Sequence, residues 1–524
     1  MMIKAVFSIL LALVPSVSML SQSTQAIQNL NRAMEILDAT MERSFRGSST
    51  NYYMVDVCDV TNNEVSGPSD VWPYTAAIEA HCSVLEALTA MKEDAPELYT
   101  QHYSVYAQQL DKLIDNLEYY RGSYTLVSYA TRKTWSTVYA VPRASARGKG
   151  DVTGDNLKKN VYDDQMWLAR ELIRAYRLTG NIDYKNKAID LVNYVIDGWD
   201  CWRDQEGEEY GGITWGPGYN SKHACSNGPI IQPLVWLHDI FKDEDQDATY
   251  TFYYRDTDNN VTSKAVKYTD LYLDFAQKIY TWQKNHLYNR QTHLYFDMLG
   301  ADNTLQYVGT GAARRRAHVD CGSPTGTAYT YNTGTMLAGA VELLRVTGDE
   351  TYKSDIEDLT KYCYTGFSKL VHRDGMSYRE WPTDKSPLQG FNVWFNNVLM
   401  RAYVDASASP VVSSFSDMSL QSFETNLDYA YDHYLRSHML PINLLKGWED
   451  NNKTKGFHQA SFAAEYAMLA IWRHRQQTDA VSKMECHFQQ PLKFYNLNGQ
   501  LTQGTSDSLP HGIYIAQGHK FYVK

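Results

Sequence analysis

YRLTGN at residues 176–181 and LRVTGD at residues 344–349 are two versions of one joint between helices. In both, glycine follows the last apolar helical position, where a left-handed helix end costs least for a residue without a Cβ atom. Asn181 or Asp349 then supplies a side-chain oxygen that can cap a following helix. The repeated joint predicts a repeated helical hairpin, although turns of this kind also recur by chance.

Helical periodicity continues on both sides of these joints, up to about residue 478. The predicted helices cover residues 25–45, 73–92, 98–121, 162–179, 182–197, 228–241, 268–286, 327–347, 350–372, 390–404, 419–437 and 456–477. The loops between them are short or medium, and little of this region alternates as strands do. The even number of helices predicts an all-α fold of helical hairpins.

Two regions depart from this pattern. Residues 242–267 are rich in Asp, Thr and Tyr and predict a surface insertion that could form a hairpin. Residues 484–524 alternate apolar and polar positions, with a turn at residues 496–500, and predict a small C-terminal β module. The helical domain is therefore expected over residues 22–478.

The first 21 residues resemble a secretory signal. Lys4 precedes an apolar stretch over residues 5–20 that is short for a membrane helix and is broken by Pro15, with cleavage expected near Ser21. No later segment is apolar enough to insert into a bilayer. We therefore expect an exported protein, located in the periplasm, at the cell surface or outside the cell.

Composition narrows the partners. A formal net charge of -11 argues against nucleic acid and anionic membrane surfaces as partners. We also expect the protein to be a monomer. The 40 Tyr, 16 Phe and 12 Trp suit stacking on sugar rings, but they could equally fill a large core. The basic run Arg314-Arg315-Arg316 is predicted to be a solvated loop, with a cleft lining as the alternative.

Cysteine and histidine give little sign of a metal site. The seven Cys are irregularly spaced without a Cys-x-x-Cys motif, and their odd number leaves at least one thiol unpaired. The 15 His include no His-Glu-x-x-His. We expect no metal and no organic cofactor.

Two adjacent carboxylates, Asp163 and Asp164, open the predicted helix over residues 162–179. Like charges this close push two pKa values apart, so that one group can be an acid while the other stays ionised. Glycosidic cleavage needs such a pair. The structural alternative is that Asn160 caps the helix and the two acids complement its dipole.

Polar and aromatic residues also gather at other helix entrances. The loop YGGITWGPG at residues 210–218 runs into SNGP at residues 226–229, and Trp215 could be either a sugar platform or a packing residue. Further helices start at WPY, residues 72–74, and at YNTG, residues 331–334. If these entrances meet at one face of a ring of hairpins, they surround one cleft.

The order of these motifs resembles glycoside hydrolase family 76, which comprises α-1,6-mannanases. The resemblance covers roughly residues 50–475, and Tyr-Asp-Asp at residues 162–164 is its most specific element. It implies an (α/α)6 toroid and retaining, endo-acting hydrolysis of an α-1,6-mannan polysaccharide or oligosaccharide. The family often has Glu directly after the two aspartates and Gln directly after Tyr-Asn, whereas this chain has Gln165 and Thr333 at these positions. These differences concern contacts with the sugar more than the cleavage step.

The resemblance assigns Asp163 as the nucleophile and Asp164 as the acid/base. The expected sugar-binding residues are Trp72, Tyr162, Trp167, Trp215, Asn227, Tyr331 and Asn332. The C-terminal β module resembles short modules of exported bacterial proteins, some of which act in secretion. Two alternatives remain: another (α/α)6 glycoside hydrolase, inverting or specific for uronides, and a mannan-binding protein without activity.

Overall fold

The computed structural model describes residues 24–62, 65–153, 159–300, 304–382, 391–448, 452–489, 494–495, 500–502, 512–516 and 519–523. The expected signal segment, residues 1–21, and most of the expected turn at 496–500 lie outside these residues. The chain divides into two compact units, Ile27–Trp472 and a second one of Met1–Ala26 and Arg473–Lys524. Among the described residues, no helix is both long and apolar enough to cross a bilayer.

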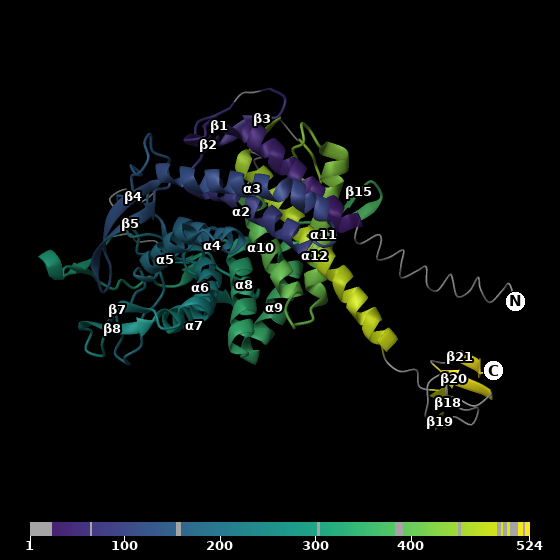
Figure 1. Ribbon diagram of the computed structural model, residues 1–524. Coiled ribbons are helices and arrows are strands. Elements are labelled where there is room, and N and C mark those ends of the chain that lie inside the picture. The colour runs from purple at the N-terminus through teal and green to yellow at the C-terminus, as the bar shows by residue number, and fades with distance from the viewer. Residues whose placement is uncertain are drawn as a thin grey trace. The chain divides into compact units, whose positions relative to one another are not determined.

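The larger unit is built from helices that pair as consecutive hairpins (Figure 1). A first helix covers residues 24–44. The others are α2 (Val71–Ala90), α3 (Pro96–Asn116), α4 (Tyr162–Thr179), α5 (Ile182–Ile196), α6 (Ile231–Glu244), α7 (Tyr268–Leu287), α8 (Thr330–Thr347), α9 (Glu350–Phe367), α10 (Phe391–Ser407), α11 (Ser414–Tyr434) and α12 (Gly456–Gln489). The all-α prediction is confirmed, and the helix bounds agree to within a few residues except at the end of α12.

The first helices of successive hairpins form the inner ring. α2 packs on α4, α4 on α6, α6 on α8, and α8 on α10. The ring closes through α12, where Phe457 contacts Trp72 of α2 with ring centroids 5.0 Å apart. Outside, the helix over residues 24–44 packs on α11, and Asn29 donates to Glu424 at 2.8 Å. This arrangement is an (α/α)6 toroid.

The repeated joint has the geometry that the sequence predicted. Gly180 and Gly348 end α4 and α8 in the left-handed conformation, with φ of 72° and 69°. The Asn181 side chain accepts a hydrogen bond from the backbone N–H of Asp183, and the side chain of Asp349 accepts one in the same way at the start of α9. Each joint therefore satisfies backbone groups at the end of one helix and at the start of the next.

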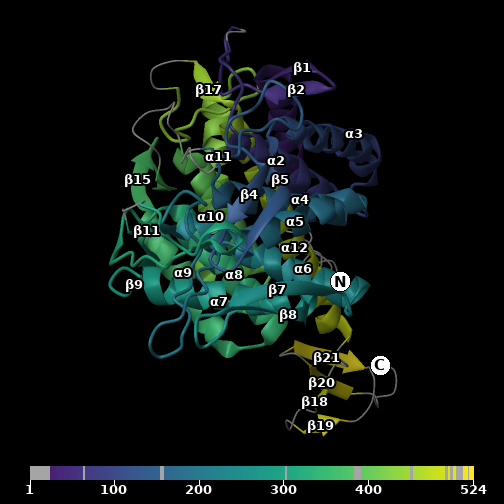
Figure 2. The ribbon, with the colours of Figure 1, turned by 90° about the vertical axis from the view of Figure 1, so that its left-hand side faces the viewer.

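Short antiparallel hairpins interrupt the helices; the hairpin within residues 242–267 agrees with the expected insertion, and the others were not predicted. The paired strands are β1 (Phe45–Ser48) with β2 (Asn51–Met54), β4 (Arg121–Val127) with β5 (Arg132–Tyr139), β7 (Thr249–Arg255) with β8 (Val261–Lys267), and β15 (Lys369–Arg373) with β16 (Met376–Glu380). The β4 and β5 strands mix buried, partly buried and exposed side chains, which is a weak sequence signal for a strand next to long helices. In Figure 2, β4, β5, β7 and β8 face the viewer.

Shorter strands fix the long loops. They are β3 (Val57–Asp59), β6 (Lys222–His223), β9 (Tyr288–Asn289), β10 (Leu294–Tyr295), β11 (Met298–Leu299), β12 (Tyr307–Val308), β13 (Arg315–Arg316), β14 (Pro324–Thr325) and β17 (Lys453–Lys455). β11 pairs with both β6 and β14, which joins three loops that are far apart in the chain. These pairings hold irregular segments over one end of the toroid.

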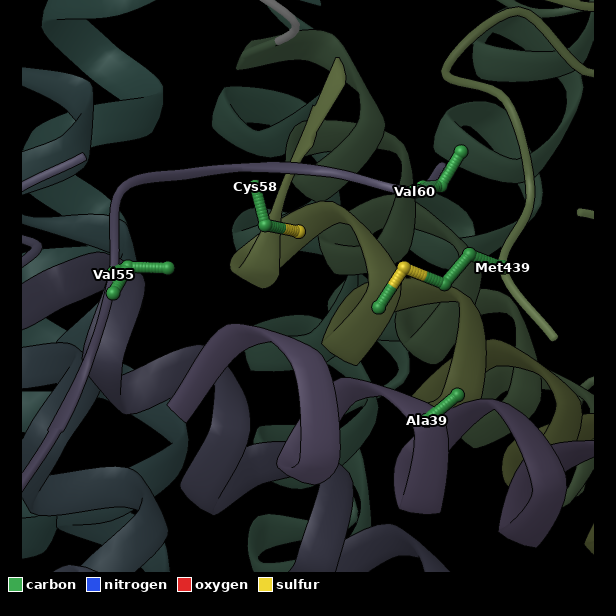
Figure 3. Packing of buried hydrophobic residues seen from close by; sticks show 5 residues of the cluster. All are labelled: Ala39, Val55, Cys58, Val60 and Met439. Atoms are coloured by element: carbon green, nitrogen blue, oxygen red, sulfur yellow. The ribbon is translucent and has the colours of Figure 1, made fainter. Parts of the chain in front are cut away.

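A small apolar cluster ties the start of the larger unit to the segment between α11 and α12 (Figure 3). It consists of the buried side chains of Ala39, Val55, Cys58, Val60 and Met439. The strand β3 beside it pairs with β17, which leads directly into α12. Fully burying one such apolar side chain contributes about 1.5–3 kcal/mol, so the cluster stabilises the closure of the ring.

The second unit contains a four-stranded sheet in the order β19-β18-β20-β21. Its strands are β18 (Phe494–Tyr495), β19 (Leu501–Thr502), β20 (Gly512–Ala516) and β21 (His519–Val523). α12 continues to Gln489, beyond the end at residue 477 that the periodicity predicted. The polar composition after residue 475 weakened the helical pattern without ending the helix.

Candidate active site

One cleft with a volume of ≈ 490 Å³ lies at the amino-terminal ends of the inner helices. Helices α2, α4, α8 and α10 and the loops before them contribute its walls. The lining residues are Asp70, Trp72, Val141, Val161, Asp163, Asp164, Trp167, Trp215, Tyr219, His223, Cys225, Asp297, Tyr331, Trp394 and Phe395. The helix entrances that the sequence singled out therefore do meet at one place.

The acidic pair occupies the first turn of α4. The N-cap position is Val161, which makes no side-chain cap. The capping role expected for Asn160 was wrong, because its amide donates to Val152 and its oxygen accepts from Tyr194. Instead the backbone N–H of Tyr162 donates to the Trp215 carbonyl at 2.8 Å, which joins the helix start to the glycine-rich loop.

Asp163 is half-buried, and its Oδ2 accepts a hydrogen bond from the indole Nε1 of Trp215 at 3.3 Å. Burial raises the pKa of Asp163 to about 6, against the opposing effect of hydrogen bonds from Trp215 and Cys225. Its Oδ1 is buried and has no hydrogen-bond partner within the described parts of the chain. A polar atom in this condition at a cleft is a candidate contact for a ligand.

Asp164 is only 3% exposed. Burial raises the pKa of Asp164 well above its usual range, and the neighbouring charges of Asp163 and Asp70 raise it further. Its Oδ2 is also buried without a partner among the described residues. The two carboxyl groups therefore favour holding a proton over both being ionised, and the larger upward pKa shift is that of Asp164.

The glycine-rich loop owes its path to two glycines. Gly211 and Gly212 have φ of 69° and 78°, and a Cβ atom on either would lie 2.7 Å or 2.3 Å from the ring of Trp282. The loop then carries Trp215 into the cleft, where its ring stacks on His223 at 4.8 Å and tilts against Tyr219 at 4.7 Å. Trp215 is thus a packed residue whose N–H is directed at Asp163.

A third carboxylate faces the pair across the cleft. Asp297 follows β10 and is half-buried, and its Oδ1 accepts from Asn332 at 3.2 Å and from the Tyr331 hydroxyl at 3.4 Å. Burial raises the pKa of Asp297. Asn332 has no exposed surface, so its role is to orient Asp297.

Three tryptophans from three inner helices form another wall of the cleft. Trp394 lies 5.5 Å from Trp72 and 4.8 Å from Trp167, measured between ring centroids. The Trp394 indole donates to Glu79 at 3.2 Å, and Arg401 donates to the same carboxylate at 2.6 Å. The wall is therefore anchored to a buried ion pair in the centre of the toroid.

The family model for glycosyl hydrolase family 76 matches residues 48–253 and 260–477. The chain belongs to glycosyl hydrolase family 76. It is accordingly a glycoside hydrolase, and the sequence resemblance to this family is confirmed. No curated protein sequence matches the chain.

Solved structures of family 76 share the fold at low sequence identity. A family 76 mannosidase of Bacteroides thetaiotaomicron VPI-5482 has a TM-score of 0.61 and 17% identity, over 86% of this chain and all (100%) of the other. A family 76 enzyme of a bovine Bacteroides thetaiotaomicron strain has a TM-score of 0.61 and 18% identity, with 85% and 78% covered. An inactive variant of an α-1,6-mannanase of Salegentibacter sp. HEL1_6, in complex with α-1,6-mannotriose, has a TM-score of 0.54 and 17% identity, with 85% and 99% covered.

Three of the sugar-binding residues predicted for this family 76 enzyme do not line the cleft: Tyr162, Asn227 and Asn332, the last of which lies behind Asp297. Tyr162 is buried and packs against Tyr194, and a Cβ atom on Gly198 would lie 2.8 Å from its ring. Asn227 has no exposed surface; its amide donates to the carbonyls of Ile213 and His223. Tyr162 and Asn227 therefore support the site without lining it: Tyr162 packs beneath the start of α4, and Asn227 holds the backbone of the glycine-rich loop.

The sequence also missed several cleft residues of the family 76 enzyme. Trp394 and Phe395 begin α10, and the argument from helix entrances could have found them. Asp297 lies in a loop and His223 in the two-residue strand β6, both without a local signal, and only the tertiary structure brings them to the pair. Among the described residues, no three His, Cys, Asp or Glu side chains gather to hold a metal ion.

The basic run was predicted to be a solvated loop, and for Arg316 this was wrong. Arg316 is 3% exposed and donates to acceptors in the segment 214–220. Arg315 is partly buried and donates to the Ala130 carbonyl at 2.8 Å. A guanidinium is buried only where several acceptors surround it. The acceptors of Arg316 lie about a hundred residues earlier in the chain, so no local pattern predicts them.

Proposed function

We propose that the protein is an exported, retaining endo-α-1,6-mannanase in which Asp163 is the nucleophile and Asp164 the acid/base. The observation that carries the proposal is the pair of adjacent carboxyl groups, which share one aromatic cleft and differ in their electrostatic environment. Retaining glycosidases need one carboxylate and one carboxylic acid close to the same sugar.

The surroundings favour this division of roles. Trp215 donates to Asp163, and the α4 amino terminus adds a partial positive charge, so both favour the ionised nucleophile. Asp164 accepts no comparable hydrogen bond from the described residues, and the charged groups that act on it are the carboxylates of Asp163 and Asp70. The proton of the pair is therefore held where a leaving oxygen needs it.

In the proposed double displacement, a carboxylate oxygen of Asp163 attacks the anomeric carbon. The bond to the leaving glycosidic oxygen breaks as Asp164 gives that oxygen its proton. Asp164, now ionised, removes a proton from water, and the resulting hydroxide displaces Asp163 from the sugar. Only the two steps together return Asp163 to its carboxylate form and Asp164 to its protonated form.

Mannan as substrate is supported by the relatives. The Salegentibacter protein is named an α-1,6-mannanase, and its inactive variant replaces two consecutive aspartates and holds α-1,6-mannotriose. This chain has two consecutive aspartates at the start of α4. Its cleft also offers tryptophan faces for sugar rings and the Asp297 carboxylate for sugar hydroxyls.

The test is digestion of debranched α-1,6-mannan with product sizing, together with NMR of the first-formed anomer. Short oligosaccharides with the α configuration support the proposal. Release of mannose alone would contradict endo action, and a first-formed β anomer would indicate an inverting glycosidase instead. Binding without any turnover would favour the mannan-binding alternative.

Export, a monomeric state and a sorting role for the β module are further parts of the proposal. The apolar stretch over residues 5–20 supports export. Expression of the full chain in a bacterial host, followed by fractionation and amino-terminal sequencing, tests it. Recovery of the intact amino terminus in the cytosol would contradict the proposed signal.

A further inference from the structure

Arg316 is a buried cation that belongs to a loop far from the acidic pair in the chain. Its Nη1 donates to Pro217 O at 3.3 Å and to Thr214 Oγ1 at 3.4 Å, and its Nη2 donates to the Tyr219 carbonyl and, at 3.0 Å, to Asn220 Oδ1. These acceptors surround the turn that follows Trp215. One guanidinium therefore cross-links both sides of this turn.

The backbone of Arg316 is itself fixed on two sides. Its N–H donates to the Ser128 carbonyl at 2.9 Å, and its carbonyl accepts from the Trp202 indole at 2.9 Å. Its neighbour Arg315 holds Ala130 of the same hairpin end. The guanidinium is thus presented from a rigid support, as a positioning group requires.

The same strand end holds the other side of the glycine-rich loop. His318 contacts Asp200 Oδ2 at 2.8 Å, and Lys222 donates to the same oxygen at 2.9 Å. The His318 ring stacks on Tyr210 with centroids 3.5 Å apart. Residues 315–318 therefore fasten the loop both before and after Trp215.

The loop in turn contacts the first turn of α4, which carries the acidic pair, at two points. The Trp215 carbonyl accepts from the first residue of α4, and its indole donates to Asp163. Any shift of the turn at residues 214–220 moves the indole relative to the carboxylate. A displacement of about 1 Å in a catalytic group can lower turnover on the order of a hundredfold.

We propose that Arg316 is a positioning residue that acts through Trp215 to hold Asp163 in place and ionised. This proposal rests on the proposed function of Asp163 as the nucleophile. Lysine does not replace arginine here, because a single ammonium cannot reach acceptors on both sides of the turn in a fixed planar array.

Among the described residues, the groups around Asp163 supply no competing positive charge. The titratable residues that line the cleft with it are Asp70, Asp164, Tyr219, His223, Cys225, Asp297 and Tyr331. Burial lowers the pKa of His223 to about 4, so this imidazole is neutral at pH 7. Loss of the Trp215 hydrogen bond therefore leaves the ionised form of Asp163 with less support.

The experiment is a double-mutant cycle of Arg316→Lys and Trp215→Phe, with Arg314→Lys as the matched control. Arg314 is exposed, and its guanidinium lies over the ring of Tyr307. We expect R316K to lower kcat on α-1,6-mannan oligosaccharides on the order of tenfold with little change in KM, and to move the acid limb of kcat/KM to higher pH. In the W215F background the same change should have little further effect. R314K should leave both parameters near those of the wild type.

If R316K lowers kcat by the same factor in both backgrounds, or if R314K lowers it as much as R316K does, the positioning role is overturned while the proposed function stands. A wild-type protein without mannanase activity would instead overturn the proposed function. In that case a crystal structure of R316K decides the inference: an unchanged Trp215–Asp163 hydrogen bond contradicts it. If R316K does not fold, Asn220→Ala, which removes one acceptor of Arg316, enters the same cycle with the same outcomes.

Discussion

The indole N–H of Trp215 points at a carboxylate oxygen of Asp163, with 3.3 Å between Nε1 and Oδ2. The two residues are 52 positions apart, and the loop and the helix that carry them are joined again through the backbone of Tyr162. One ring thus packs between His223 and Tyr219 and at the same time stabilises a charge. Its function is electrostatic as well as steric.

Trp215→Phe keeps most of the ring and removes the donor. Because the hydrogen bond lowers the pKa of Asp163, its loss should raise that pKa, and the acid limb of the kcat/KM profile should move to higher pH. We expect kcat at pH 7 to fall on the order of a hundredfold to a thousandfold, the range for loss of one hydrogen-bond donor to a developing charge. An unshifted acid limb would show that the indole does not act on Asp163.

Asp164→Asn removes the proposed acid without changing the size of the side chain. Hydrolysis of α-1,6-mannan should fall about 10²–10⁴-fold, the usual contribution of a general acid–base group. An aryl mannoside with a good leaving group should still form the glycosyl-enzyme, and added azide should restore turnover as an α-mannosyl azide. Asp163→Asn should show no azide rescue of this kind, and rescue in that variant would reverse the two roles.

Stability should depend on pH through the same pair. Burial places the pKa of Asp163 and of Asp164 above the unfolded value of about 3.9, so the folded chain binds more protons than the unfolded chain. The pair therefore costs stability progressively as pH rises from about 4 through the raised folded values. The double variant D163N/D164N should have a higher Tm than the wild type at pH 8, and the difference should shrink towards pH 4. A Tm difference that is constant with pH would contradict this.

The central ion pair offers a test of the fold. Glu79 is buried and accepts from Arg401 and Trp394, so Glu79→Ala leaves Arg401 without its partner. We expect the free energy of unfolding to fall by about 3–5 kcal/mol in urea titrations. Glu350→Ala removes the exposed partner of Lys353 and should cost no more than about 1 kcal/mol. Similar losses for the two variants would mean that the core pair contributes no more than a surface one.

Much of the fold could be predicted because its signals are local. A helix end such as Thr179-Gly180-Asn181 depends on the φ value of one residue and on one side-chain cap, both encoded within a few positions. The placement of Asp163 and Asp164 in a first helical turn is local in the same way. The hairpin of β4 and β5 was missed because a short and weak strand pattern competes poorly with a long helical period beside it.

The rest of the site depends on contacts between distant segments. The sequence places Asn227 at a helix start, but its side-chain oxygen accepts a hydrogen bond from the backbone N–H of Ile213. The sequence predicts Tyr162 to be an aromatic residue of the cleft, but its ring fills the space beside Gly198. The sequence predicts Arg316 to be a surface charge because the acceptors that allow its burial lie about a hundred residues earlier in the chain. Asp297 has no distinguishing neighbours in the sequence and gains its role only from Asn332.

The two glycine joints lie at the end of α4 and α8 that is remote from the cleft. Each helix has 18 residues, so about 27 Å of helix separates Gly180 or Gly348 from the chemistry. In the described part of the chain, no atom beyond the adjacent residues and the helix backbone lies within 4 Å of a Cβ atom added at either glycine. Both glycines therefore have open space on the side where a Cβ atom would lie. Thermostability engineering, fusion tags and surface attachment can therefore be directed to this end of the toroid, where altered loops leave catalysis untouched.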